Sequence, residues 1–150
     1  MRKIVKPVTI LMADDDADDC KLTKEMFEEC RVPNELRFVE NGEELLDCLW
    51  RRGRFQNQEA TSSRPGLILL DLHMPRKDGL SALKEIKADP VMRQIPVVVL
   101  TSSMAEDDIF RSYDLGVTSY IVKPVTFEAL LDVLQTFEIY WFRIVEMGQN

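Results

Sequence analysis

Residues 67–71 of this chain of 150 residues read LILLD, four consecutive aliphatic side chains followed by an aspartate. An apolar run of this length, preceded by the turn residues Pro65-Gly66, is typical of a strand that is buried on both faces. Such strands belong to parallel sheets that helices cover on both sides. Similar runs at 8–13, 97–100 and 119–122 indicate that LILLD has parallel neighbours.

Strand and helix patterns alternate along the whole chain. Predicted strands cover 8–13, 35–39, 67–70, 97–100 and 119–122, and predicted helices cover 16–30, a stretch after Asn41-Gly42, 79–89, 105–115 and 126–147. In the first helix, the predicted inward face consists of Leu22, Met26, Phe27 and Cys30. The order is a βα unit repeated five times, which predicts a three-layer α/β/α fold around a five-stranded parallel sheet. We expect a single domain with a core at about residues 7–147, a surface loop at 53–66 and no output domain.

Composition and charge disfavour several classes of function. The chain has 45% hydrophobic and 30% charged residues, an ordinary globular balance, and a formal net charge of −7. Binding to nucleic acid or to an anionic membrane surface relies on Lys and Arg, so this charge argues against both. No apolar run approaches a membrane span of about 18 residues. The N-terminus lacks the apolar stretch of a secretory signal, so a cytoplasmic location is expected.

Carboxylates follow two of the predicted strands. Asp14 and Asp15 come after strand 8–13, and Asp71 comes after LILL. Ligands of open parallel sheets lie beyond the carboxyl ends of the strands, so these side chains should meet. Two unit charges about 4 Å apart repel by about 4 kcal/mol at an effective dielectric constant of 20. A divalent cation offsets this repulsion, and oxygen ligands favour Mg²⁺. Taken singly, the acids could instead cap a solvated helix or a loop.

A hydroxyl and an amine follow two other strands. Strand 97–100 leads into Thr101, and strand 119–122 leads into Lys123. A phosphoryl group needs positive or hydrogen-bonding partners for its oxygens, which these side chains can supply. Asp71 can then act as a covalent nucleophile. Each residue alone is common at a strand end or turn, and it is their joint occurrence that predicts a phosphoryl-accepting site.

Four segments resemble the receiver domain of two-component response regulators, the flavodoxin-like (CheY-like) fold family that includes the bacterial chemotaxis regulator. They are ILMADDDADD (10–19), LILLDLHMPRKDG (67–79), PVVVLTSS (96–103) and GVTSYIVKP (116–124). The resemblance implies that Asp71 is the phosphoacceptor. It implies that Mg²⁺ is held by Asp14, Asp15, Asp71 and the backbone carbonyl of His73. It also implies that Thr101 and Lys123 bind phosphoryl oxygens and that the Lys123-Pro124 peptide is cis.

The same resemblance implies how the domain signals. A phosphohistidine on a sensor histidine kinase donates the phosphoryl group, and the domain catalyses its own phosphorylation and dephosphorylation without being an enzyme in the usual sense. Thr101 then shifts, and Tyr120 turns inward as the switch residue. The surface made by the last two predicted helices and the strand between them repacks for a partner protein. His73 and Ser103 are expected to modulate the reaction.

The final predicted helix carries more apolar side chains than one buried stripe requires. Phe127, Leu131 and Leu134 are expected to face the core. Further apolar surface comes from Val133, Ile139, Tyr140, Trp141, Phe142 and Ile144. The excess predicts a homodimer or partner surface at Tyr140, Trp141, Phe142 and Ile144. The long loop, the acidic start and the IYWF ending resemble single-domain regulators that partner phytochrome-type histidine kinases.

Three other functions share some of these features. A phosphatase of the haloacid dehalogenase type needs a second Asp two residues after its nucleophile, where this chain has His73. A flavin carrier on the same fold needs a phosphate-binding first loop, where Asp14-Asp15-Asp16 would repel an anion. A degenerate receiver would bind partners without phosphorylation, although here all the expected site residues are present.

Overall fold

The computed structural model describes residues 9–56, 64–102 and 119–134. Within these ranges the elements are β1 (Ile10–Ala13), α1 (Ala17–Glu29), β2 (Leu36–Val39), α2 (Gly42–Trp50), η1 (Gly53–Phe55), β3 (Leu67–Asp71), α3 (Gly79–Ala88), η2 (Met92–Gln94), β4 (Val97–Thr101), β5 (Ser119–Val122) and α5 (Phe127–Leu134). The strands form one parallel sheet in the order β2-β1-β3-β4-β5. The predicted five-stranded parallel sheet is therefore confirmed.

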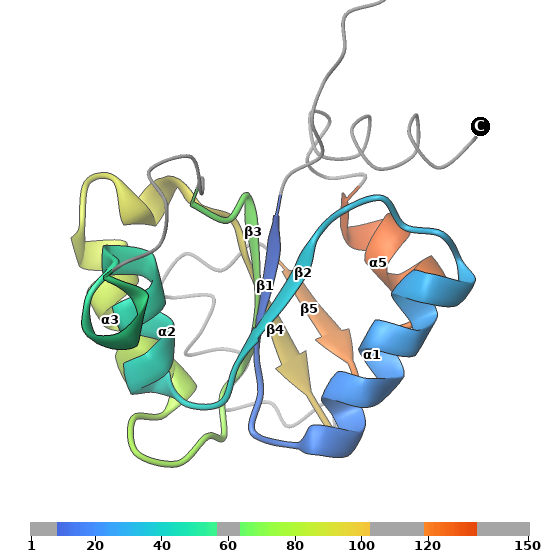
Figure 1. Ribbon diagram of the computed structural model, residues 1–150, viewed down its shortest axis with the longest axis horizontal. Coiled ribbons are helices and arrows are strands. Elements are labelled where there is room, and N and C mark those ends of the chain that lie inside the picture. Colours follow the sequence, from blue (N-terminus) through green and yellow to red (C-terminus); the bar gives the residue numbers. More distant parts are fainter. Residues whose placement is uncertain (1–8, 57–63, 103–118, 135–150) are drawn as a thin grey trace, which may run out of the picture.

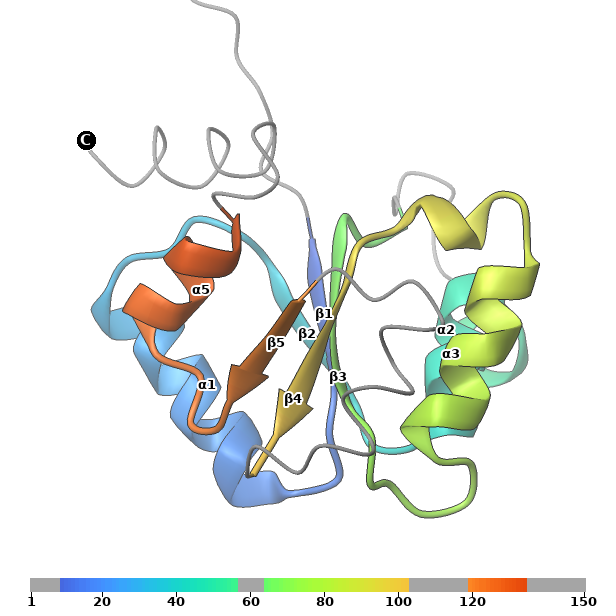
Figure 2. The same cartoon turned by 180° about the vertical axis from the view of Figure 1, so that it is seen from behind.

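Helices cover both faces of the sheet and make three layers (Figure 1). The pair α2 and α3 packs on one face, and α1 and α5 pack on the other, as the view from behind also shows (Figure 2). The predicted helix at 105–115 and the continuation of the final helix to 147 lie outside the described residues. No helix in the described ranges is both long enough and apolar enough to cross a membrane.

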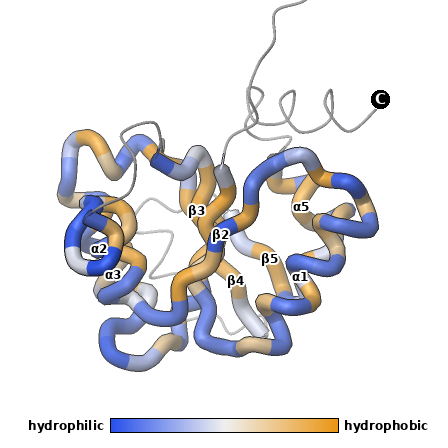
Figure 3. The backbone as a smooth tube through the Cα atoms, viewed as in Figure 1, coloured by the Kyte–Doolittle hydropathy of each residue, from blue (hydrophilic) through white to orange (hydrophobic). Residues whose placement is uncertain are grey.

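Each central strand contributes to two separate hydrophobic cores because successive side chains of a strand point to opposite faces. In β1, Leu11 and Ala13 join the core beneath α2 and α3, whereas Ile10 and Met12 join the core beneath α1 and α5. The strands form mostly hydrophobic stretches between helices that carry many hydrophilic residues (Figure 3). This double burial explains why the strands read as continuous apolar runs rather than as alternating ones.

Each of the four α-helices in the described residues begins beside a polar side chain that caps its first turn. Asp16, Asn41 and Asp78 accept hydrogen bonds from backbone N–H groups at the starts of α1, α2 and α3. Thr126 Oγ1 accepts from the N–H of Ala129 at 3.1 Å at the start of α5. Such caps satisfy N–H groups that have no partner within the helix, and they set where each helix leaves the strand end.

The inward face of α1 differs from the prediction. Thr23 and Phe27 are buried, whereas Leu22 is 51% exposed and Cys30 is exposed. Residues four apart share a helix face, so burying Thr23 and Phe27 turns Leu22 outward. Thr23 fits in the core because its hydroxyl donates to the carbonyl oxygen of Asp19 at 2.9 Å.

Two further predictions about packing are wrong. Val133, predicted to lie on excess apolar surface, is only 6% exposed and packs in the core beneath α1 and α5 together with Leu130. Phe55, within the predicted surface loop, is buried against the core beneath α2 and α3. The physical reason is the same in both cases, because an aromatic or branched side chain near a core edge lowers the free energy by leaving water.

Candidate functional site

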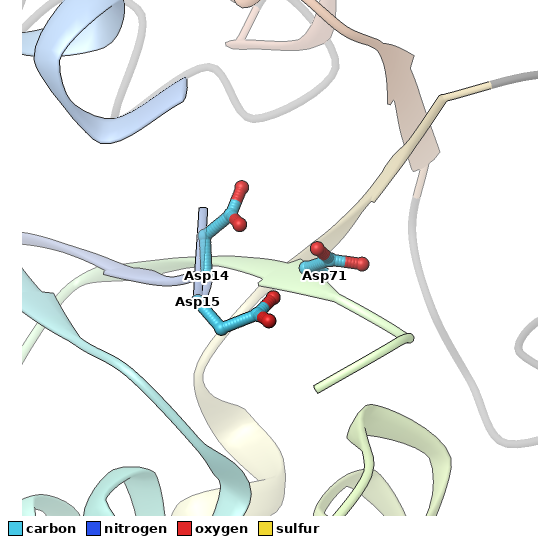
Figure 4. Close-up of side chains that lie close together, drawn as sticks. All are labelled: Asp14, Asp15 and Asp71. Atoms are coloured by element: carbon cyan, nitrogen blue, oxygen red, sulfur yellow. The ribbon is translucent and has the colours of Figure 1, made fainter. Parts of the chain in front are cut away.

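The strand register places the carboxyl ends of β1 and β3 side by side. Ala13 pairs with Leu70, so Asp14 and Asp71 leave the sheet as neighbours, and Asp15 follows. One oxygen from each of the three carboxylates lies within 4.8 Å of the others. Figure 4 shows the three side chains gathered around the same space beyond the strand ends. The structure thus brings together the three acids that the sequence singled out.

Lys123 reaches this cluster from the end of β5. The N–H of Lys123 donates to the carbonyl oxygen of Thr101 at 2.7 Å, which holds the end of β5 beside β4. The Lys123 Nζ atom lies 2.7 Å from Asp14 Oδ2 and 3.0 Å from Asp71 Oδ2. The Lys123-Pro124 peptide is cis, as predicted. An ammonium group therefore lies between the two buried carboxylates.

A fourth carboxylate, which sequence reasoning missed, also contacts this lysine. Asp19 Oδ2 accepts a hydrogen bond from Lys123 Nζ at 2.9 Å, although the two residues are 104 positions apart. Asp19 lies three residues after the capping Asp16, on the first turn of α1. It lies four residues before the buried Thr23 and so shares its helix face, but because Thr23 reads as polar, no sequence pattern marked that face as inward.

Asp71 is held from several sides. It is 7% exposed, its Oδ1 atom accepts from the N–H of His73 at 2.9 Å, and its Oδ2 atom accepts from Lys123. A Cβ atom on Gly79 would lie 2.4 Å from the carbonyl oxygen of Asp71, so α3 can approach this closely only because residue 79 is glycine. The Gly79 N–H also donates to the carbonyl oxygen of Leu72 at 3.0 Å. The backbone on both sides of Asp71 is therefore well anchored.

Burial and the crowding of charged groups shift the pKa values of side chains in and beside the site. Burial raises the pKa of Asp14 to about 6, although the Lys123 ammonium opposes this rise. Burial acts to lower the pKa of Lys123, but its contacts with the carboxylates of Asp14, Asp19 and Asp71 outweigh burial and raise the pKa above the ordinary value. Burial, followed by the charges of Asp14 and Asp19, raises the pKa of the Cys20 thiol to about 11. These directions describe a site with excess negative charge.

The donor set fits a divalent cation. Asp14 Oδ2 is buried, and its contact with Lys123 Nζ at 2.7 Å is an ion pair; among the described residues no group donates a hydrogen bond to it. Asp15 is exposed, and its carboxylate completes the group of three oxygens. Hard cations such as Mg²⁺ and Mn²⁺ prefer carboxylate oxygens, and a divalent charge would relieve the repulsion among these acids.

The structure describes only some of the other predicted site residues. Thr101 is the half-buried last residue of β4, and Tyr120 is half-buried in β5 and packs against the core beneath α2 and α3. His73 is exposed on the loop after β3. The predicted modulating residue Ser103 and the predicted dimer or partner residues lie outside the described residues; the latter are Tyr140, Trp141, Phe142 and Ile144.

Fold and site together define a doubly wound α/β domain with an acidic, lysine-containing centre at the carboxyl ends of its strands. The family described as the response regulator receiver domain matches residues 10–135. The chain therefore belongs to the response regulator receiver family.

Individual relatives cover almost the whole chain. Response regulator Rcp1 from Synechocystis sp. is 38% identical over 141 residues, which make up 94% of this chain and 93% of that protein. The structure of the bacteriophytochrome response regulator AtBRR superposes with a TM-score of 0.82 at 38% identity, covering 91% of this chain and 96% of that one. The phosphorylated cyanobacterial phytochrome response regulator RcpA gives a TM-score of 0.72 at 41% identity, covering 91% and 94%. A Mn²⁺-bound form of Rcp1 has also been solved.

Proposed function

We propose that this chain is a response regulator that accepts a phosphoryl group on Asp71 from a phosphohistidine of a sensor histidine kinase, in a reaction that requires Mg²⁺. The observation that carries the proposal is the convergence of Asp14, Asp15, Asp71 and Lys123 at one end of the sheet. Membership of the receiver family and the phosphorylated relative RcpA support it.

The transfer forms one bond and breaks one bond. A carboxylate oxygen of Asp71 attacks phosphorus, the bond from phosphorus to the imidazole nitrogen of the kinase breaks, and that nitrogen keeps the electron pair. Lys123, already 3.0 Å from Asp71 Oδ2, neutralises charge on the transferred group. The Thr101 hydroxyl donates a hydrogen bond to another phosphoryl oxygen. The domain's contribution is mainly positioning and electrostatic stabilisation.

Asp14, Asp15, Asp71 and the backbone carbonyl of His73 would hold the cation. When bound, Mg²⁺ would supply positive charge that lowers the repulsion between the carboxylates and an incoming phosphoryl group. The Mn²⁺-bound form of Rcp1 supports a divalent cation in this family, and the three clustered carboxylates, with a buried Asp14 Oδ2 that accepts no hydrogen bond, support it in this chain.

We infer that the donor is a phytochrome-type histidine kinase. AtBRR and RcpA are described as response regulators of bacteriophytochrome and phytochrome, and both are more than a third identical to this chain. The test is phosphotransfer from a panel of purified autophosphorylated kinases. A phytochrome-type kinase should transfer fastest, and preferential transfer from an unrelated kinase would refute this assignment.

Phosphorylation is proposed to act through Thr101 and Tyr120. Tyr120 packs against the core beneath α2 and α3, so its inward rotation would reshape β5 and its neighbours. A partner protein or a second copy of the chain would read this change, with Tyr140 and Phe142 at the contact between copies. Sedimentation of the parent and of a Tyr140→Ala/Phe142→Ala double variant tests the dimer. A parent that stays monomeric when concentrated and phosphorylated would contradict it.

The central experiment is phosphorylation by acetyl phosphate followed by intact-mass spectrometry. The parent should gain one phosphoryl group with Mg²⁺ and none with a chelator. The Asp71→Asn variant should gain none, whereas Asp18→Asn, which removes an exposed charge near the start of α1, should behave like the parent. A parent that gains no phosphoryl group, or an Asp71→Asn variant that still does, would refute the proposed phosphoacceptor.

A further inference from the structure

Lys123 is bound by more carboxylates than the proposed phosphoryl site needs. Its ammonium group contacts Asp14 at 2.7 Å, Asp19 at 2.9 Å and Asp71 at 3.0 Å. Asp19 and Asp71 accept hydrogen bonds from this ammonium group, and Asp14 forms an ion pair with it. Asp14 and Asp71 already have tasks in the proposed function, whereas Asp19 has none.

Asp19 is held where it can reach the lysine. Its N–H donates to Asp16 Oδ1 at 3.1 Å, and its carbonyl oxygen accepts from the Thr23 hydroxyl at 2.9 Å. The next residue, Cys20, packs against the core beneath α1 and α5. The backbone around Asp19 is therefore tied down on both sides, and its carboxylate projects from a rigid helical turn rather than from a loop.

We propose that Asp19 is a positioning residue that holds the Lys123 ammonium over Asp71, an inference that rests on the proposed function. Lys has four flexible side-chain torsions and gains specificity only from the partners that hold it. From the side of β1 and α1, Asp19 accepts a hydrogen bond from the ammonium group and Asp14 forms an ion pair with it, while another N–H is directed at Asp71. When Asp71 carries a phosphoryl group, this N–H can donate to a phosphoryl oxygen while the contacts with Asp14 and Asp19 remain.

The exposure of the three carboxylates supports a positioning role for Asp19. The Asp14 side chain is fully buried and that of Asp71 is 10% exposed, whereas the Asp19 side chain is 25% exposed and lies at the rim. A rim carboxylate can hold the lysine without adding a further buried charge beside Asp71. Its contribution is moderated by solvent, so the expected effect of its loss is a slower reaction rather than an inactive protein.

The test compares Asp19→Asn with Asp18→Asn, which removes the same charge one residue away without a contact to Lys123. With Mg²⁺ and acetyl phosphate, Asp19→Asn should be phosphorylated on the order of tenfold more slowly, because its amide oxygen can still accept a hydrogen bond but no longer carries the charge that attracts the ammonium group. Asp18→Asn should match the parent. The Asp19→Asn effect should vanish in a Lys123→Met background, because a positioning residue has no task once its lysine is removed.

Three outcomes would overturn the proposal. They are an unchanged rate in Asp19→Asn, a faster rate, and an equal slowing in the Lys123→Met background, which would indicate a structural role of α1. A second readout needs no phosphodonor. Side-chain NMR relaxation of the Lys123 ε-methylene group should show larger motion in Asp19→Asn than in Asp18→Asn. If the parent takes no phosphoryl group, the proposed function fails, and this relaxation measurement still decides whether Asp19 holds the lysine.

Discussion

His73 lies at the point where the backbone of the site meets solvent. Its N–H donates to Asp71 Oδ1, while its side chain is exposed on the loop after β3. The backbone of this residue therefore helps to orient the proposed phosphoacceptor, and its side chain is free to differ without loss of that bond. An imidazole two residues after Asp71 is well placed to influence a water molecule that attacks the acyl phosphate.

We predict that His73→Ala lengthens the lifetime of the acyl phosphate on the order of tenfold, because an imidazole that orients or deprotonates the attacking water is lost. The lifetime is measured by intact mass after removal of the phosphodonor. The His73→Ala variant keeps the N–H bond to Asp71, so its rate of phosphorylation should change little. Equal lifetimes in variant and parent would show that the side chain has no such role.

At the scale of elements, the loop between β3 and α3 is held at both ends by glycines. Besides Gly79, the start of α2 contacts this loop, since the Gly42 N–H donates to the carbonyl oxygen of Lys77 at 2.9 Å. A Cβ atom on Gly42 would lie 2.2 Å from the same oxygen. Backbone atoms cannot yield as the end of a flexible side chain can, so α2 and the loop approach closely only because residue 42 is glycine.

Gly42→Ala is therefore predicted to destabilise the protein by about 1–3 kcal/mol, as overpacking does. The free energy of unfolding from urea denaturation measures the effect. Without the clash, alanine would stabilise a helix by up to about 1 kcal/mol relative to glycine. The sign of the change in the free energy of unfolding therefore shows whether the clash occurs. A more stable variant would contradict the close approach of α2 and the loop.

The cap of α3 gives a prediction about pH. A hydrogen bond from the Ser81 N–H to Asp78 holds the pKa of Asp78 below its usual value of 3.8. The stabilisation from this ionised cap is thus fully present above pH 3.8 and is lost as the pH falls through the lower pKa of the folded state. Asp78→Asn should keep the cap and lose this pH dependence, whereas Asp78→Ala should cost about 1 kcal/mol at neutral pH.

Urea denaturation at neutral and at acid pH measures both effects. An acid-induced loss of stability as large in Asp78→Asn as in the parent would assign that loss to other carboxylates.

The strands could be predicted from sequence more reliably than the helix faces. LILLD and its neighbours are apolar on both faces, and only a doubly covered strand explains that pattern. The inward face of α1 was predicted correctly at Met26 and Phe27 and wrongly at Leu22 and Cys30. The burial of Thr23 was missed because this residue reads as polar, and its burial depends on a bond to the Asp19 carbonyl that no residue pattern reveals. Val133 was misplaced because a run of apolar residues at the start of the final helix leaves its rotation undetermined.

The sequence was sufficient to predict the site residues that lie at strand ends. Asp14, Asp15, Asp71 and Lys123 follow strands directly, so topology alone brings them together. Asp19 could not be placed in this way because it sits on a helix, where its reach to Lys123 depends on the angle at which α1 leaves β1. That angle is a property of packing between elements and not of local spacing.

For the whole molecule, the charge at the site links metal binding to stability. Asp14, Asp19 and Asp71 contact one lysine, and Asp15 adds a further carboxylate beside Asp14 and Asp71. A bound cation should therefore stabilise the folded state relative to the unfolded chain. A ligand present at 100 times its Kd stabilises by about 2.7 kcal/mol. For a chain of this size that free energy corresponds to an increase in Tm of about 5–10 °C.

We predict such an increase in Tm when Mg²⁺ is added to the parent, measured by thermal unfolding with and without a chelator. Asp15→Asn should lose most of the increase, and because Asp15 is exposed, the variant should fold normally without metal. Asp18→Asn, an equal change of charge outside the cluster, should keep the increase. An effect of Mg²⁺ that is the same in both variants would indicate general screening and not a specific site.

The pairing of Ala13 with Leu70 has a consequence for how this protein can vary. The separation of Asp14 from Asp71 is set by hydrogen bonds between adjacent strands, and the length of chain that joins those strands does not enter it. Insertions or deletions in the connections, such as the stretch between η1 and β3, should therefore leave the reactive centre unaltered. These connections can therefore change in length and sequence, and so in the partners they bind, while the reactive residues at the end of the sheet stay the same.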